Sequence, residues 1–117
     1  MARISIASAK AKGRNLQKWV VTKVLAALPT LEPDDVRSCP LGSGGVDVIL
    51  SPAAKRQHPY SYECKARANG FTPVYDALDQ ASRGDGLTPI AVIKQDRRRP
   101  LVVMDAEVFY RLISNDK

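Results

Sequence analysis

Residues 44–50 read Gly-Gly-Val-Asp-Val-Ile-Leu, an apolar run that contains one acid, Asp47. Runs rich in Val and Ile that follow glycines are typical of β-strands. A carboxylate inside so apolar a strand is costly unless it is paired or binds a metal. We therefore interpret residues 45–50 as a strand and Asp47 as a functional residue on it.

A second strand-like run, residues 60–66, follows the turn-like residues 51–59. Side chains alternate between the two faces of a strand, so Glu63 and Lys65 share one face, about 6–7 Å apart, and Cys64 points to the other. The connection is long enough for the two runs to pair antiparallel. Two carboxylates and one ammonium are then expected to converge at the edge of a sheet.

Two carboxylates beside a lysine are groups that metal-assisted phosphodiester hydrolysis can use. Hard cations such as Mg²⁺ or Mn²⁺ prefer oxygen ligands, and Mg²⁺ keeps several waters while one or two carboxylates hold it. Asp47 and Glu63 supply that set. Lys65 is placed to hold the attacking water or a phosphate oxygen. The pattern predicts a nuclease.

The order Asp, turn, Glu-x-Lys resembles the PD-(D/E)XK nuclease superfamily. Val46-Asp47 stands where that family has Pro-Asp, and Glu63-Cys64-Lys65 supplies the second half. Val46 in place of Pro is a departure, but the carboxylate is the element that the chemistry requires.

The wider neighbourhood is similar to the Holliday junction resolvase branch of that superfamily and its small phage-encoded relatives. The similarity runs from about Lys10 to Met104. Its elements, in chain order, are Lys12-Gly13-Arg14 opening a helix, Ser43-Gly44-Gly45-Val46-Asp47, the Glu-x-Lys, and a helix with Gln80.

The resemblance implies the roles of the site residues. The implied catalytic set is Asp47, Glu63, Lys65, Gln17 and Gln80. The implied metal ligands are Asp47, Glu63 and the backbone carbonyl of Cys64, and the implied product carries a 5′-phosphate. Relatives often carry Glu where Gln17 stands, so Gln17 is either an amide at the rim of the site or a surface residue.

Charge and length agree with a nucleic-acid enzyme. The 117 residues include 18 Lys+Arg and 12 Asp+Glu, which gives a net charge of +6. This balance favours a polyanionic partner, here DNA, duplex or branched. No apolar run approaches the roughly 20 residues of a membrane span, and the N-terminus has no secretory apolar core. We expect a cytoplasmic protein, in the host cytoplasm if phage-encoded, with no membrane partner and no small-molecule cofactor.

The predicted fold class is α/β, with a central mixed β-sheet of about five strands flanked by helices, as in the restriction endonuclease-like core. A flexible basic arm, 1–12, is expected to precede a single domain, 13–117. Predicted helices start at 13, 72 and 105, and predicted strands cover 36–39, 45–50, 60–66, 89–94 and 101–104. In the first helix, Trp19 is expected on the buried apolar arc with Val20, Val24, Ala27 and Leu28.

The predicted nucleic-acid contacts are basic or small polar residues: Lys10, Lys12, Arg14, Ser43, Arg67, Arg97, Arg98 and Arg99. The last three occupy a hairpin tip, where they either clamp phosphates or form a solvated charged turn. His58, the only histidine, is expected to be a solvated loop residue rather than a catalytic base.

Two functions remain open at this level. The first is a divalent-metal-dependent DNA endonuclease, either selective for four-way junctions or a phage nicking enzyme. The second is a non-catalytic nucleic-acid-binding module with a degenerate nuclease fold, in which Glu63 and Lys65 form a surface ion pair of about 0–1 kcal/mol. A junction resolvase needs two active sites, so a homodimer is expected in that case.

Overall fold

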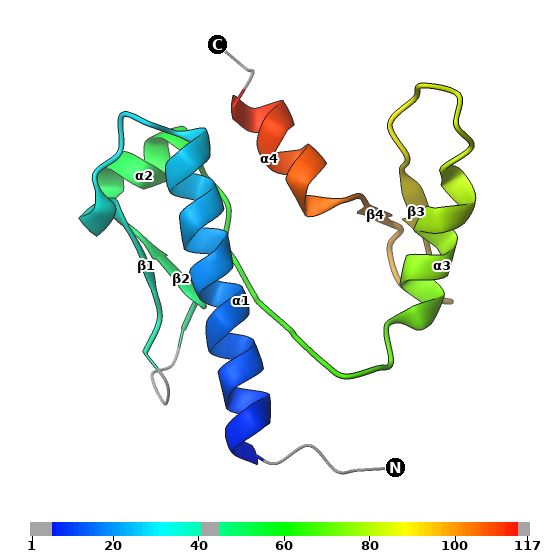
Figure 1. Ribbon diagram of the computed structural model, residues 1–117, viewed down its shortest axis with the longest axis horizontal. Coiled ribbons are helices and arrows are strands. Elements are labelled where there is room, and N and C mark those ends of the chain that lie inside the picture. Colours follow the sequence, from blue (N-terminus) through cyan, green and yellow to red (C-terminus); the bar gives the residue numbers. More distant parts are fainter. Residues whose placement is uncertain (1–5, 41–44, 115–117) are drawn as a thin grey trace. The chain divides into compact units, whose positions relative to one another are not determined.

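The computed structural model describes residues 6–40 and 45–114, which divide into two compact units, Met1–Ala68 and Asn69–Lys117. The described part of unit 1 contains α1 (Ile6–Ala27), the 3₁₀ turn η1 (Pro33–Asp35), β1 (Val36–Ser38), β2 (Val48–Leu50) and α2 (Pro52–Gln57). That of unit 2 contains α3 (Thr72–Ala81), β3 (Ala91–Ile93), β4 (Leu101–Val103) and α4 (Ala106–Ser114) (Figure 1). The chain is therefore a mixed α/β protein, as predicted.

The strands form two separate antiparallel pairs within the described residues, and the predicted central mixed sheet of about five strands is wrong. In unit 1, β1 pairs with β2, and Ser38 lies opposite Val48. In unit 2, β3 pairs with β4, and Val92 lies opposite Val102. Each strand is three residues long, so each pair is held by only a few backbone hydrogen bonds.

Residues 60–66, predicted as a strand, form an extended segment without a strand ladder. Exposure alternates from Ser61 to Ala66, so every second side chain faces the protein as in a strand. A backbone bond joins this segment to the start of β2, from Asp47 N–H to the Tyr62 carbonyl at 3.2 Å. The segment therefore keeps the alternation that the sequence predicts, although it lacks the repeated pairing of a strand.

The long helix α1 packs its apolar stripe against the β1–β2 pair. Val20, Val24 and Ala27 on this stripe are buried, together with Val36 of β1 and Val48 of β2. Because the helix begins at Ile6, it includes the second half of the segment predicted as an arm. Ala and Lys, good helix formers, dominate that part of the sequence.

Trp19 does not lie in the buried stripe of α1, contrary to the prediction. Its exposed fraction is 36 %, and the Lys23 ammonium lies 5.4 Å from the centre of its ring. The indole and the cation thus contact each other on the outer side of the helix, at the i, i+4 spacing that makes helical residues neighbours.

A short helix, α2, replaces the predicted turn between the two strand-like runs. Ser51 is its N-cap, accepting from Ala54 N–H at 3.1 Å, and Pro52 takes the first helical position. The Ser51 hydroxyl also donates to the Asp35 carboxylate at 2.6 Å. The hydrogen bond from Ser51, and after it the bond from Glu32 N–H, hold the pKa of the Asp35 carboxyl below its usual value. The Ser51–Asp35 bond also ties α2 to η1.

His58 ends α2 and is fully buried, which corrects the prediction of a solvated loop residue. Its Nε2 lies 2.7 Å from the hydroxyl of Tyr62, and its ring stacks on the Tyr62 ring. Burial lowers the pKa of the imidazole below 6.5 because the interior disfavours the charged form.

Unit 2 is a helix, a hairpin and a second helix. α3 contacts β3, and β3 and β4 form the hairpin that the sequence predicts around residues 95–100. Phe71, not Thr72, caps α3, and it provides no side-chain hydrogen bond to the helix. The buried residues in the described part of this unit are Ala91 and Tyr110. Unit 2 therefore has a much smaller core than unit 1.

None of the helices in the described ranges is both long enough and apolar enough to cross a membrane.

Candidate functional site

Asp47 is held by its backbone between two neighbouring segments of unit 1. Its carbonyl accepts from Cys39 N–H at 2.9 Å, and its N–H donates to the Tyr62 carbonyl. Gly45, two residues earlier, has φ of 99°, a left-handed conformation that favours glycine. The glycine thus permits the turn that leads the chain into Asp47, and two hydrogen bonds then fix the position of the residue.

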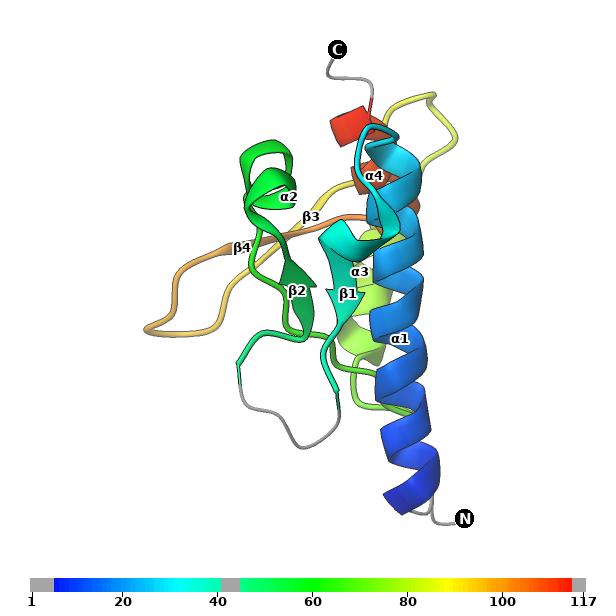
Figure 2. The same ribbon diagram turned by 90° about the vertical axis from the view of Figure 1, so that its left-hand side faces the viewer.

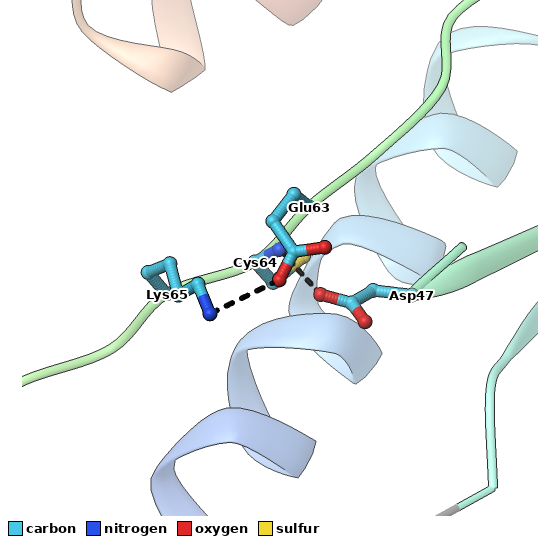
Figure 3. A network of polar contacts seen from close by, with 4 residues as sticks. All are labelled: Asp47, Glu63, Cys64 and Lys65. Atoms are coloured by element: carbon cyan, nitrogen blue, oxygen red, sulfur yellow. Dashed lines mark hydrogen bonds and ion pairs between the residues drawn. The ribbon is translucent and has the colours of Figure 1, made fainter. Parts of the chain in front are cut away.

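The Asp47 carboxylate reaches the backbone of the extended segment. Its Oδ2 accepts from Cys64 N–H at 2.6 Å (Figure 3). A carboxylate has about four acceptor positions, so this bond orients the group while leaving most of its oxygen lone pairs available. This bond joins two segments of unit 1 through residues that lie 17 positions apart in sequence.

Glu63 and Lys65 lie on the same side of the extended segment, as the alternation predicts. Lys65 Nζ is 3.2 Å from Glu63 Oε2, and the two side chains are 69 % and 63 % exposed. Such an exposed pair contributes about 0–1 kcal/mol. The pair is consequently too weak to prevent either side chain from binding a cation, a water molecule or a phosphate.

Cys64 lies between these two residues, with its side chain on the more buried side of the segment. Burial raises the pKa of its thiol, and the charges of Asp47 and Glu63 raise it further. A protonated thiol is not a metal ligand. In an extended chain the N–H and C=O of one residue point to the same side, so the Cys64 carbonyl is directed to the side on which its N–H meets Asp47.

The donor set suits a hard cation. No group of three or more His, Cys, Asp or Glu side chains that could hold a metal occurs in the described ranges. The cluster offers two carboxylates, Asp47 and Glu63, and the carbonyl of Cys64. Oxygen donors in that small number fit Mg²⁺ or Mn²⁺, which complete their coordination with water and substrate oxygens, and they do not fit a structural zinc site.

Gln17 of α1 is connected to Asp47 through the end of β1. Its side-chain oxygen accepts from the Ser38 hydroxyl at 2.9 Å, and Ser38 precedes Cys39, which bonds to Asp47. Lys10 and Arg14 precede Gln17 by seven and three residues, so all three follow one face of α1. Gln17 is thus half-buried against β1 rather than a free surface amide.

His58 and Tyr62 help to hold Asp47 in position, a role that was not predicted from the sequence. Tyr62 links the buried imidazole to the site, because its hydroxyl meets His58 and its carbonyl accepts from Asp47 N–H. A sequence signal for α2 was present in Ser51-Pro52, because Ser is a favoured N-cap and Pro is favoured at the first helical position. That helix is what brings His58 inward.

The other predicted site residues are distributed as follows. Gln80 is exposed on α3 in unit 2, so its role near the carboxylates stays a prediction. Lys12 is half-buried and Arg67 exposed in unit 1. Ser43 lies outside the described residues. The three arginines occupy the β3–β4 loop.

No family model matches this chain, and neither does any curated protein or solved structure.

Proposed function

We propose that this protein is a divalent-metal-dependent DNA endonuclease, a hydrolase of phosphodiester bonds. The observation that carries the proposal is the meeting of Asp47, Glu63, Cys64 and Lys65 in one cluster (Figure 3). Two oxygen-bearing acids beside an exposed ammonium can bind a cation and a phosphate in adjacent positions, which is what hydrolysis of a phosphodiester requires.

Each residue of the cluster has a proposed role that follows from its chemistry. Asp47 and Glu63, with the Cys64 carbonyl, would hold Mg²⁺ or Mn²⁺. When bound, such a cation lowers the pKa of its water and stabilises charge on phosphoryl oxygens. Lys65 orients the attacking water or a phosphate oxygen, and its flexible, exposed side chain allows it to leave Glu63 for that purpose.

The proposed family is the PD-(D/E)XK superfamily, in its Holliday junction resolvase-like branch. Two features of unit 1 support this. The Asp and Glu-x-Lys residues meet across adjacent segments, and the first helix presents Gln17 toward the neighbouring strand.

The proposed substrate is duplex or branched DNA. Lys10 and Arg14 lie on the same face of α1 as Gln17, where they would contact phosphates near the cluster. The net charge of +6 favours such contacts. Cutting a four-way junction needs two such clusters, so junction selectivity would go with a homodimer.

Metal binding is the first test. Calorimetric titration with Mn²⁺ should give a binding signal for the wild type that Asp47→Ala removes. Asp34→Ala is the matched control, because Asp34 is an exposed acid of η1 in the same unit. A wild type that binds no Mn²⁺, or binding that Asp47→Ala leaves intact, would exclude the metal site proposed here.

Cleavage is the second test. Lys65→Ala and Asp47→Asn should each reduce Mg²⁺-dependent cleavage by at least about 100-fold, while DNA binding persists. Lys18→Ala, an exposed lysine of α1, is the control. Four-way junction, linear duplex, single-stranded DNA and RNA should be compared as substrates. Cutting by either site variant at the wild-type rate would disprove the assignment.

The second candidate function is a non-catalytic nucleic-acid-binding module. The observation that favours it is the exposed Glu63–Lys65 pair, which is an ordinary arrangement on protein surfaces. This function predicts DNA binding without Mn²⁺ binding and without cleavage, so the two experiments above separate the alternatives.

A further inference from the structure

The loop between β3 and β4 concentrates positive charge at the end of a hairpin. It carries Lys94, Arg97, Arg98 and Arg99 against one acid, Asp96. The four cationic side chains, with Ile93, Gln95 and Leu101, line an open hollow of about 760 Å³. Figure 2 shows the loop extending beyond the ends of the two strands. Residues 94–100 are exposed, so a ligand can reach the charged side chains from solvent.

The cations of this loop are not engaged within the protein. In the described ranges, none of the side chains of Lys94, Arg97, Arg98 and Arg99 forms an ion pair or a hydrogen bond. Asp96 lies next to Arg97 in sequence without neutralising it. Three adjacent guanidinium groups repel one another, so their concentration costs stability unless an anion binds between them.

The backbone at the tip of the loop adopts a left-handed conformation at a residue other than glycine. Arg97 has φ of 64°, and it is the one residue other than glycine with positive φ in the described part of the chain. Gly or Asn would adopt this conformation at lower cost. The preference of the backbone therefore does not explain the choice of arginine at this position, and its side chain is the feature that remains to explain it.

We infer that the β3–β4 loop binds the phosphate backbone of duplex DNA, and does so without a divalent metal. Arginine matches phosphate bidentately, and a two-stranded ribbon fits the major groove of B-DNA. The hollow has no aromatic lining on which unpaired bases could stack. The groove of duplex RNA is too deep and narrow for a ribbon.

This inference takes one point from the proposed function, namely that the ligand is DNA. The loop belongs to unit 2, whereas the carboxylates belong to unit 1. Binding by the loop is therefore measurable in EDTA, where no metal-dependent step occurs.

The experiment measures binding of the full chain to a fluorescent 30-base-pair duplex in EDTA, at several salt concentrations between about 50 and 200 mM. The test variant is Arg97→Ala/Arg98→Ala/Arg99→Ala. The matched control, Lys55→Ala/Arg56→Ala/Arg111→Ala, removes three exposed cations elsewhere and gives the same net charge.

Each phosphate contact contributes about 0.9 to the slope of log affinity against log salt. Three contacts should therefore make the slope of the test variant shallower by about 2.7, and its affinity near 0.1 M salt lower by about 10²–10³-fold. The control should retain most of the wild-type slope and affinity. Equal losses in both variants would overturn the inference, because they would indicate a general charge effect.

Two further arms keep the outcome decisive. Arg97→Gly removes one cation and relieves the positive φ, so it should fold at least as stably as the wild type and reduce the slope by about 0.9. An unchanged slope overturns the inference. The wild type should also bind the duplex more tightly than it binds single-stranded DNA or anionic lipid vesicles. If the triple variant loses as much binding to either competitor as it loses to the duplex, or more, the choice of duplex DNA as the ligand is overturned.

The two proposals fail separately. Asp47→Asn should bind the duplex in EDTA with the wild-type slope, since it leaves the loop intact. If the wild type does not cleave DNA in the presence of Mg²⁺ but the loop variants lose binding as described, the nuclease proposal fails and the loop inference stands. If cleavage depends on Asp47 and Lys65 while the loop variants bind normally, the reverse holds.

Discussion

Unit 1 and unit 2 differ in how completely they bury their apolar residues. In unit 1 the stripe of α1 and the facing residues of β1 and β2 are buried, and even His58 is enclosed. In unit 2 the opposed pair Val92 and Val102 is 67 % and 66 % exposed. Two strands alone are marginally stable, so the stability of the chain must come mainly from unit 1. The carboxylate cluster lies in this better-packed unit.

The largest expected difference between the units is in the free energy of unfolding lost when a leucine is truncated. Leu28→Ala, at a position 2 % exposed in unit 1, should cost about 2–5 kcal/mol because it leaves a cavity. Leu112→Ala, 55 % exposed in α4, should change stability by no more than about 0.5 kcal/mol. Urea denaturation measures both, and similar losses would contradict the comparison.

Helix capping provides a smaller test of the same difference. Ser51→Ala removes a side-chain cap of α2 and the bond to Asp35, and should cost about 1 kcal/mol. Thr72→Ala, at the start of α3, removes no side-chain cap and should stay within about 0.5 kcal/mol. Thermal melts followed by circular dichroism would show this. A larger loss of stability in Thr72→Ala than in Ser51→Ala would contradict the conclusion that Ser51 caps its helix and Thr72 does not.

The last test is a pH dependence of stability that comes from unit 1. Because burial lowers the pKa of His58 below 6.5, the unfolded chain takes up a proton at a higher pH than the folded chain. The contribution of His58 to the free energy of unfolding should therefore be constant above pH 6.5. It should decrease as the pH falls below that value, by at most about 1.4 kcal/mol per pH unit. His58→Gln should flatten the slope between about pH 7 and pH 5. A slope of the same size in that variant would show that another group is responsible.

The local features of the fold were predictable from the sequence. Periodicity identified α1, and the basic loop between two apolar runs identified the β3–β4 hairpin. The position of Glu63 and Lys65 on one face follows from strand alternation alone. The length of the connection predicted that Asp47 and residues 60–66 can come together, and the bond from Cys64 N–H to the Asp47 carboxylate joins these two segments.

The features that depend on tertiary contacts were not predictable in the same way. Whether residues 60–66 form a ladder depends on repeated bonds to a neighbour, which alternation does not determine. His58 is buried because α2 turns the chain inward and Tyr62 accepts or donates its hydrogen bond, and a single histidine beside Pro59 gives no sign of this. Trp19 was placed on the wrong side of α1 because the apolar arc is wide enough to include it.

The backbone bonds of Asp47 also determine when the cluster can exist. The residue depends on Cys39 before it in sequence and on Tyr62 and Cys64 after it. A chain emerging from the ribosome can therefore assemble the two carboxylates and the ammonium only after Lys65 has left the exit tunnel and unit 1 has closed. Whatever chemistry the cluster performs therefore begins only with the folding of this unit.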